Sequence, residues 1–183
     1  MNRIKGFSLI EVLVTLLLVT VGLLGMVALQ SRGIQFTQDS VQRNSAIELS
    51  GQLLELMRAN AGEVFDETSP VNKGIKNASL FLKDKGSNFS PVATVPTPDE
   101  CIAPQTAEEQ RNCWLEQVKS KLPKADTLLT SQFYICHSST PGNCDKMGST
   151  LEVQLAWYVK DDACPDDNAP DKNTCIYRTR IEL

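Results

Sequence analysis

The chain has 183 residues, a hydrophobic content of 42% and a formal net charge of −4. Its length suits one ordinary domain plus an appendage, and a chain with an excess of acidic groups is not expected to bind nucleic acid. With a single histidine, a Ser-His-Asp catalytic arrangement is not convincing either.

A long apolar segment lies close to the N-terminus. From Val12 to Ser31 there are twenty residues without a charge, mostly Leu and Val. As a helix, such a segment spans roughly 30 Å, the hydrocarbon thickness of a bilayer. Core helices of soluble domains are rarely apolar on every face, so the segment predicts a membrane span. Arg3 and Lys5 precede it, which predicts a cytoplasmic N-terminus and export of the rest of the chain.

A cleavable secretory signal peptide is the competing interpretation of this segment. Such a peptide has a shorter apolar core, followed by an A-x-A-like cleavage site. Here the apolar run is longer, carries a carboxylate near its start, and is followed by "ALQSRG", which is a poor cleavage site. We therefore expect the segment to remain in the mature protein.

The carboxylate is that of Glu11, within "KGFSLIEVLV". A charge at the centre of a spanning helix costs about 3 kcal/mol on insertion scales, and such groups usually have a partner. On a helix, Glu11 lies one turn after Phe7 and shares a face with it. The alternative is a carboxylate that merely reaches water at the membrane boundary, but an ionisable group in this position favours a functional role.

The residues "GFSLIE", from Gly6 to Glu11, stand directly before the span. They resemble the class III leader of type IV pilins and pseudopilins. The resemblance implies that a prepilin peptidase cleaves between Gly6 and Phe7 and methylates the new amine of Phe7. It also implies that Glu11 pairs with the N-terminal amine of a neighbouring subunit during filament assembly. Independently of the family, a glycine before the cleaved bond leaves that bond unobstructed.

Two later stretches, "GLLGMVALQ" at the end of the span and "ELMRAN" at residues 55–60, resemble minor pilins of the PilV type. The resemblance implies a subunit that helps to initiate type IV pilus assembly and joins other minor pilins and the major pilin. It also implies contact with the inner-membrane assembly platform, and a place at the pilus tip with a large adhesin. The implied location is the inner membrane, with a periplasmic head, and then the extracellular pilus. Adhesion and twitching motility would depend on such a subunit.

Two other functions are compatible with parts of the sequence. A minor pseudopilin of type II secretion shares the leader and the architecture, although its head is usually smaller and poorer in cysteine. A membrane-tethered periplasmic enzyme or ligand-binding module would have activity in its head and would not depend on Gly6.

The predicted domain order follows from the N-terminal half. Residues 7–62 contain no proline, and apolar residues recur beyond the span at helical spacing, so we expect one long helix that ends near Asn60–Gly62. The expected parts are a cleaved leader (1–6), a transmembrane half-helix (7–31), a periplasmic amphipathic half-helix (32–62) and a globular head (63–183).

The head is expected to be mixed α and β. Residues 63–100 are rich in turn formers and suggest a connection with one short element around Leu80–Lys83. A helix is predicted at Thr106–Leu122, because Thr106 and Glu109 fit a capping box and Pro123 ends it. Strands are predicted at Gln132–His137, Leu151–Lys160 and Thr174–Glu182.

The fold class that follows is α+β, with a type IV pilin-like arrangement. The long helix would pack on a small antiparallel sheet. In the middle strand, Val153, Leu155, Trp157 and Val159 alternate onto one side.

The six cysteines form three close pairs along the chain, at Cys101/Cys113, Cys136/Cys144 and Cys164/Cys175. An even count in an exported domain suggests disulfides. The sequence allows many connectivities, and local pairing fits best because each pair brackets one segment. Loops of this size stabilise by about 3 kcal/mol each on the chain-entropy model.

No metal, cofactor or catalytic group is expected from the remaining motifs. His137 follows Cys136 and would point to the opposite face of a strand, which does not suit zinc. The acidic stretch 161–173 invites a calcium hypothesis but lacks the D-x-D-x-D-G pattern, so we expect a solvated hairpin loop. Lys119, Lys121 and Lys124 are interpreted as a solvated helix face.

Overall fold

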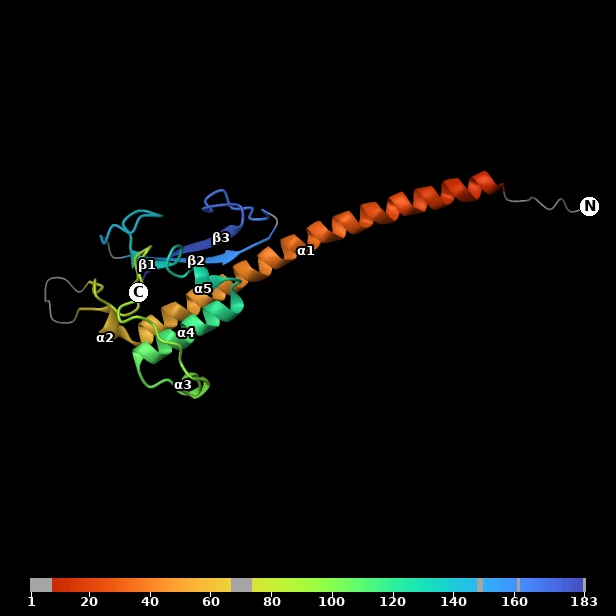
Figure 1. Cartoon of the computed structure of the whole chain (residues 1–183). Coiled ribbons are helices and arrows are strands. Elements are labelled where there is room, and N and C mark those ends of the chain that lie inside the picture. The colour runs from red at the N-terminus through yellow and green to blue at the C-terminus, as the bar shows by residue number, and fades with distance from the viewer. Residues whose placement is uncertain (1–7, 67–73, 148–149, 161, 183) are drawn as a thin grey trace, which may run out of the picture. The chain divides into compact units, whose positions relative to one another are not determined.

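A computed structural model describes residues 8–66, 74–147, 150–160 and 162–182. The chain divides after Ser40 into an N-terminal unit and a compact unit that begins at Val41, here called the head unit. The elements within the described residues, labelled in Figure 1, are α1 (Leu9–Ala59), α2 (Ala61–Val64), α3 (Pro98–Ile102), α4 (Ala107–Lys121), α5 (Ala125–Leu128), β1 (Tyr134–His137), β2 (Leu151–Tyr158) and β3 (Thr174–Ile181).

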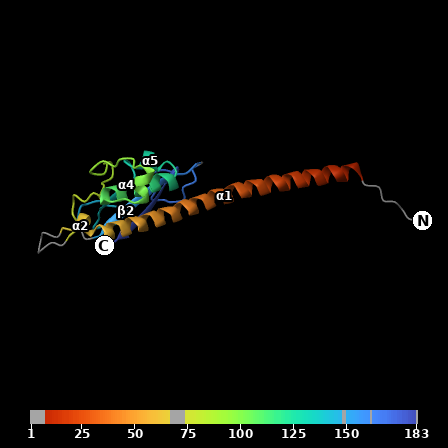
Figure 2. The ribbon, with the colours of Figure 1, turned by 90° about the horizontal axis from the view of Figure 1, so that it is seen from below.

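Helix α1 is 51 residues long and contains no proline that would interrupt it. Its last turns belong to the head unit and run along one side of it (Figure 2). Ala46, Leu49, Leu53 and Met57 are completely buried there, and their spacing of three and four residues places them on one helix face. The helix therefore contributes a row of apolar side chains to the core of the head, as its amphipathic pattern predicts.

Helix α4 confirms the second predicted helix, with each end moved inward by one residue. The capping box is present: Glu109 N–H donates to Thr106 Oγ1 at 3.2 Å, and Thr106 N–H donates to Glu109 Oε2 at 3.3 Å. Trp114 is buried between α4 and α1, and its indole Nε1–H donates to the carbonyl oxygen of Leu49 at 2.9 Å. This bond fixes α4 against the last turns of α1.

The three strands form an antiparallel sheet in the order β1-β2-β3. The sheet, the disulfides and the long apolar helix confirm the predicted α+β, type IV pilin-like fold. The predicted strands were slightly too long, since β1 begins two residues later, β2 ends two residues earlier and β3 ends one residue earlier. Lys160 lies in a bend after β2, and Val159 donates its N–H to the carbonyl oxygen of Asn173 at 2.8 Å.

Strand β2 is buried on both faces, which its partly alternating sequence did not predict. Val153, Leu155 and Trp157 have no exposed surface, as expected for the core side. Glu152 and Gln154 on the other side are also buried, at 0% and 2% exposure. The polar side is covered because the loop after β1 folds back over it, as described below.

The cysteines are joined as the three sequential pairs, with Cα–Cα distances of 5.5, 5.5 and 5.4 Å. Cys101–Cys113 links α3 to α4, Cys136–Cys144 links β1 to the loop that follows it, and Cys164–Cys175 links the loop before β3 to that strand. The short helices α2, α3 and α5 were not expected. The element expected around Leu80–Lys83 is neither helix nor strand: it consists of turns and of one isolated bridge between Lys83 and Ile135.

Candidate functional site

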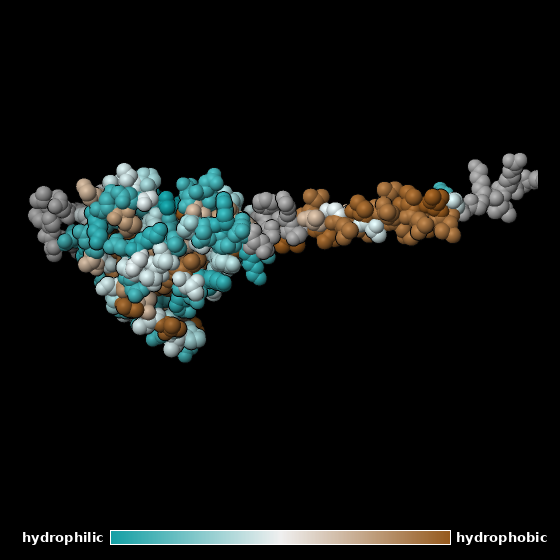
Figure 3. Space-filling view, turned by 45° about the horizontal axis from the view of Figure 1, so that its top comes forward, coloured by the Kyte–Doolittle hydropathy of each residue, from teal (hydrophilic) through white to brown (hydrophobic). Residues whose placement is uncertain are grey.

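The N-terminal part of α1 is the first candidate site. Among the described residues, one helical segment is long and apolar enough to cross a membrane: Leu9–Gln30, with a mean hydropathy of 2.7. None of it is buried within the protein, and apolar side chains cover it in Figure 3. Such a segment needs an apolar environment that this chain alone does not supply, which fits anchoring in a membrane.

The two threonines inside this segment are satisfied by the helix itself. Thr15 Oγ1 donates to the carbonyl oxygen of Val12 at 2.9 Å, and Thr20 Oγ1 donates to that of Leu17 at 2.8 Å. Glu11 is the only charged residue between Leu9 and Gln30.

The carboxylate of Glu11 is exposed in the first turn of α1. No other described side chain forms a hydrogen bond or an ion pair with it. A negative charge in a first turn interacts favourably with the helix dipole, but that gain is smaller than the cost of placing a charge in lipid. Glu11 is therefore a group that a partner chain can bind. Gly6 and Phe7 lie outside the described residues, so their predicted processing is not tested.

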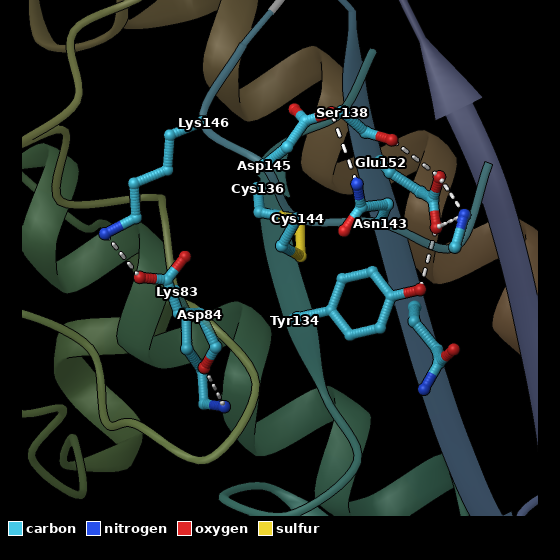
Figure 4. The surroundings of a disulfide bond; sticks show 12 residues. Lys83, Asp84, Tyr134, Cys136, Ser138, Asn143, Cys144, Asp145, Lys146 and Glu152 are labelled. Atoms are coloured by element: carbon cyan, nitrogen blue, oxygen red, sulfur yellow. Dashed lines mark hydrogen bonds and ion pairs between the residues drawn. A yellow bond between two sulfur atoms is a disulfide. The ribbon is translucent and has the colours of Figure 1, made fainter. Parts of the chain in front are cut away.

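A second polar arrangement lies in the head unit, around Glu152 of β2 (Figure 4). Tyr134 donates its hydroxyl proton to Glu152 Oε1 at 2.7 Å, and Gly142 N–H lies 2.9 and 2.8 Å from the two carboxylate oxygens. Ser138 Oγ lies 3.0 Å from Oε2 and 2.6 Å from the carbonyl oxygen of Thr140, so its one proton serves one of these acceptors at a time.

Arg178 of β3 completes this arrangement. Its Nε lies 3.3 Å from Glu152 Oε1, and its guanidinium also donates to Gln154 Oε1 at 3.1 and 2.8 Å. A buried carboxylate with a cation and several donors is well compensated. Burial and the hydrogen bond to Glu152 raise the pKa of the Tyr134 hydroxyl, so Tyr134 stays a donor throughout the ordinary pH range.

The Glu152 arrangement holds the loop after β1 against the sheet. Gly142 belongs to that loop and has φ +84°, a conformation that glycine adopts without strain. The disulfide Cys136–Cys144 encloses the same loop. The sequence offered only an indirect signal for this role, namely a glutamate inside a predicted strand beside an arginine in the next strand. We interpret the arrangement as structural.

Two more charged side chains are buried in the head unit. Lys83 donates from Nζ to the carbonyl oxygen of Phe133 at 2.7 Å, and burial lowers its pKa from 10.5 to about 8. Arg111 has no exposed surface, donates to the carbonyl oxygen of Leu80 at 3.0 Å, and lies 3.6 Å from a carboxylate oxygen of Glu108. Both side chains cross-link loop carbonyl groups to the core, and neither is placed as a catalytic group.

The acidic stretch 161–173 forms local contacts in its described part. Asp166 pairs with Arg43 of α1 at 3.9 Å and accepts the N–H of Asn168 at 2.9 Å. Asn173 donates its side-chain amide to Asp162 Oδ1 at 2.9 Å. No three His, Cys, Asp or Glu side chains gather at metal-binding distance within the described residues, so nothing in the structure favours the calcium hypothesis.

Comparison with known proteins gives information on the N-terminus. The family described as "Prokaryotic N-terminal methylation motif" matches residues 1–27. No curated protein and no solved structure matches the chain. The matched range includes Glu11 and most of the apolar segment, and it supports a type IV pilin or a pseudopilin.

Proposed function

We propose that the chain is a minor pilin of the PilV type, which helps to initiate type IV pilus assembly and forms part of the complex at the pilus tip. One observation carries the proposal. The methylation motif at residues 1–27 overlaps the apolar segment Leu9–Gln30, whose single charge, Glu11, has no partner among the described residues. A plain membrane anchor needs no such charge, because the charge only raises its cost of insertion.

Processing is the first step of the proposed function. A prepilin peptidase removes residues 1–6 by cleaving between Gly6 and Phe7 on the cytoplasmic side, and the amine of Phe7 is methylated. Residues 7–31 remain in the inner membrane, with residues 32–62 and the head at 63–183 in the periplasm. The two basic residues before the span, Arg3 and Lys5, support this orientation.

Assembly follows from the charge that processing creates. The amine of Phe7 on one subunit is positive, and the carboxylate of Glu11 on the next subunit is negative. In an apolar environment, each group is costly alone and much less costly when paired. The pair therefore fixes the axial position at which one subunit joins another, while the apolar side chains of α1 supply the packing surface.

The partners of such a subunit are other minor pilins, the major pilin, the assembly platform and a tip adhesin. The head, with its three disulfides and well-filled core, is suited to a position outside the cell. Adhesion and twitching motility depend on the subunit indirectly, through the pili that it helps to initiate.

Two variants of the full-length gene test the proposal in the producing organism. In Glu11→Gln, we expect normal cleavage and membrane insertion, but about tenfold less protein in sheared pili, since the ion pair is lost while the shape is kept. Thr15→Val is the matched control, because the Thr15 hydroxyl only bonds to its own helix; its incorporation should equal that of the wild type. Equal incorporation of both variants would contradict the proposed role of Glu11.

Mass spectrometry and a gene deletion test the remaining steps. The mature protein should begin at Phe7 and carry one additional methyl group, and a substitution of Gly6 that blocks cleavage should abolish function. Deletion of the gene should remove surface pili and leave protein secretion intact. Loss of secretion with intact pili would instead identify a pseudopilin, and full function of the uncleaved protein would indicate a tethered periplasmic module.

A further inference from the structure

The two edges of the head's sheet differ in whether another segment of the chain bonds to them. At the β1 edge, Ile135 N–H donates to the carbonyl oxygen of Lys83 at 2.8 Å, and Lys83 N–H donates to that of Ile135 at 2.8 Å. The segment around Lys83 thus covers this edge. The opposite edge is strand β3, and no described strand lies beyond it.

The register shows which backbone groups of β3 point outward. Ile135 turns its backbone toward Lys83, so its neighbours Tyr134 and Cys136 are the β1 residues that bond to β2. Since backbone direction alternates along a strand, the β2 residues that bond to β3 are Leu151, Val153, Leu155 and Trp157.

Their partners on β3 are Ile181, Thr179, Tyr177 and Cys175. The intervening residues, Ile176, Arg178 and Arg180, must direct their N–H and C=O groups away from the sheet. Among the described residues, no backbone group bonds to them on that side.

This outer edge lacks the features that usually protect an exposed strand. The β2–β3 pairing is continuous from Leu151↔Ile181 to Tyr158↔Thr174, without a bulge, and β3 contains no proline. Its two arginines are exposed and keep their charge beside the edge, but their bonds lie on the near side and leave the outward backbone groups uncovered. Arg178 turns back to Gln154 Oε1, and Arg180 donates to the carbonyl oxygen of Ser138 at 2.8 Å.

We propose that the outer edge of β3 binds an extended, acidic segment of another polypeptide in the assembly as an added strand. Two outward backbone sites at exposed residues, Arg178 and Arg180, supply the hydrogen bonds of such a pairing, whereas Ile176 is only 4% exposed and is not counted as an open site. Arg180 has no carboxylate partner among the described residues, and Arg178 has only the buried Glu152. Acidic side chains of an added strand opposite Arg178 and Arg180 would be favourable. The one acidic residue of this chain in the same alternating series is Glu182, which lies after the end of β3.

A second copy of this chain is disfavoured as the added strand. Two β3 edges paired about a twofold axis at Arg178, near the strand centre, would place Arg178 directly opposite Arg178 of the other copy, and like charges directly opposite each other are destabilising. The inference deepens the proposed function, on which it rests, by naming the surface and the chemistry of the partner segment.

A pair of variants at one position separates the backbone from the side chain. Arg180→Thr and Arg180→Pro both remove the guanidinium, but only the proline removes the outward N–H. Neither change removes a β2–β3 hydrogen bond, because the N–H of Arg180 points away from β2, and proline is tolerated at such edge positions. Equal unfolding midpoints of the two full-length variants in detergent micelles would verify this.

The measured quantity is the amount of each variant that co-purifies with a tagged major pilin from the producing cells. We expect Arg180→Thr to retain association within a few-fold of the wild type, and Arg180→Pro to associate about tenfold less, since a partner carbonyl loses its donor. Equal association of the two variants, whether high or low, would overturn the inference.

Amide hydrogen exchange of the unmodified full chain provides a second measurement that needs no variant. In the free protein in micelles, the amides of the exposed residues Arg178 and Arg180 should exchange quickly, while those of Tyr177 and Thr179 exchange slowly. In assembly complexes, the amides of Arg178 and Arg180 should become at least about tenfold slower. Unchanged exchange of these amides in the complexes would overturn the added strand.

The outcomes also distinguish this inference from the function on which it rests. If the wild type and both variants enter pili equally, the pilin function stands and the added strand is wrong. If the wild type is never cleaved after Gly6 and never enters pili, the proposed function is wrong, and with it the partner assigned to β3.

Discussion

Replacing Glu152 by glutamine tests whether the buried carboxylate holds the head together. The substitution keeps the size of the side chain but replaces one carboxylate oxygen by an N–H₂ group and removes the negative charge. With its amide oxygen in the Oε1 position, the glutamine can still accept from Tyr134 and Gly142, as Oε1 does now at 2.7 and 2.9 Å, but both bonds lose the strength that the charge gives them, and the second bond from Gly142 N–H, at 2.8 Å to Oε2, is lost. The guanidinium of Arg178, now 3.3 Å from Oε1, loses its counter-charge.

The expected cost follows from these contacts. A hydrogen bond to a charged group is worth about 1.5–3 kcal/mol, and removing one member of a fully buried ion pair costs about 3–5 kcal/mol. Arg178 is partly exposed and keeps its bonds to Gln154, which lowers the cost. We therefore expect Glu152→Gln to reduce the free energy of unfolding by about 3 kcal/mol.

The assay is urea unfolding of the full chain in detergent micelles with the disulfides intact, followed by tryptophan fluorescence. Trp114 and Trp157 are both buried in the head, at 2% and 0% exposure, so the signal reports on its core. Trypsin provides a local readout, because opening of the loop should accelerate cleavage after Lys146. Glu116→Gln is the control: Glu116 pairs with Lys119 at the surface, and its loss should cost less than about 1 kcal/mol.

A loss below about 1 kcal/mol in Glu152→Gln, with unchanged trypsin cleavage, would refute the reasoning. It would mean that the loop is held by the disulfide Cys136–Cys144 and that the carboxylate adds little.

Three further predictions concern the head unit and use the same unfolding assay. The pKa of Lys83 is lowered from 10.5 to about 8, so between these two pH values the unfolded state binds more protons than the folded state. The free energy of unfolding should therefore rise with pH by up to about 1.4 kcal/mol per pH unit in that range, and a Lys83→Met variant should lack this rise. Trp114→Phe should cost about 1 kcal/mol more free energy of unfolding than Trp157→Phe. Both changes remove a similar volume, but only Trp114 gives up a hydrogen bond, to the Leu49 carbonyl oxygen, since Trp157 Nε1 has no partner among the described residues. Equal costs would argue against the Trp114–Leu49 bond. Gly142→Ala should cost about 2 kcal/mol, since φ is +84° and the added Cβ would lie 3.0 Å from Arg178 Nη1, and an unchanged midpoint would contradict this.

The local features of the chain could be predicted because neighbouring residues determine them. The end of α1 near Asn60 and the box between Thr106 and Glu109 depend on helix periodicity and on capping chemistry, both of which act within a few residues. The sequential disulfides could be predicted for the same reason, since each closes a short loop.

Contacts between distant residues could not be predicted from the sequence. Arg43 lies 3.9 Å from a carboxylate oxygen of Asp166 and 5.9 Å from the ring centre of Trp157, both more than a hundred residues away along the chain. Lys121 and Lys124 are exposed, as interpreted, and they also reach distant residues: Lys121 bonds to Glu48 of α1 at 2.8 Å, and Lys124 lies 4.1 Å from the ring centre of Tyr158. Only folding brings these residues together.

The sequence by itself determined the methylation motif, the long apolar segment and the place of Glu11 in it, because these are linear features that require no partner in the fold. The tertiary structure decided the role of Glu152 and the difference between the two sheet edges. A glutamate in a strand can equally face water, and it becomes a cross-link only where Tyr134, Gly142 and Arg178 surround it. Likewise, an edge is open or closed according to which distant segment bonds to it, and here Lys83 covers β1 while no described strand lies beyond β3.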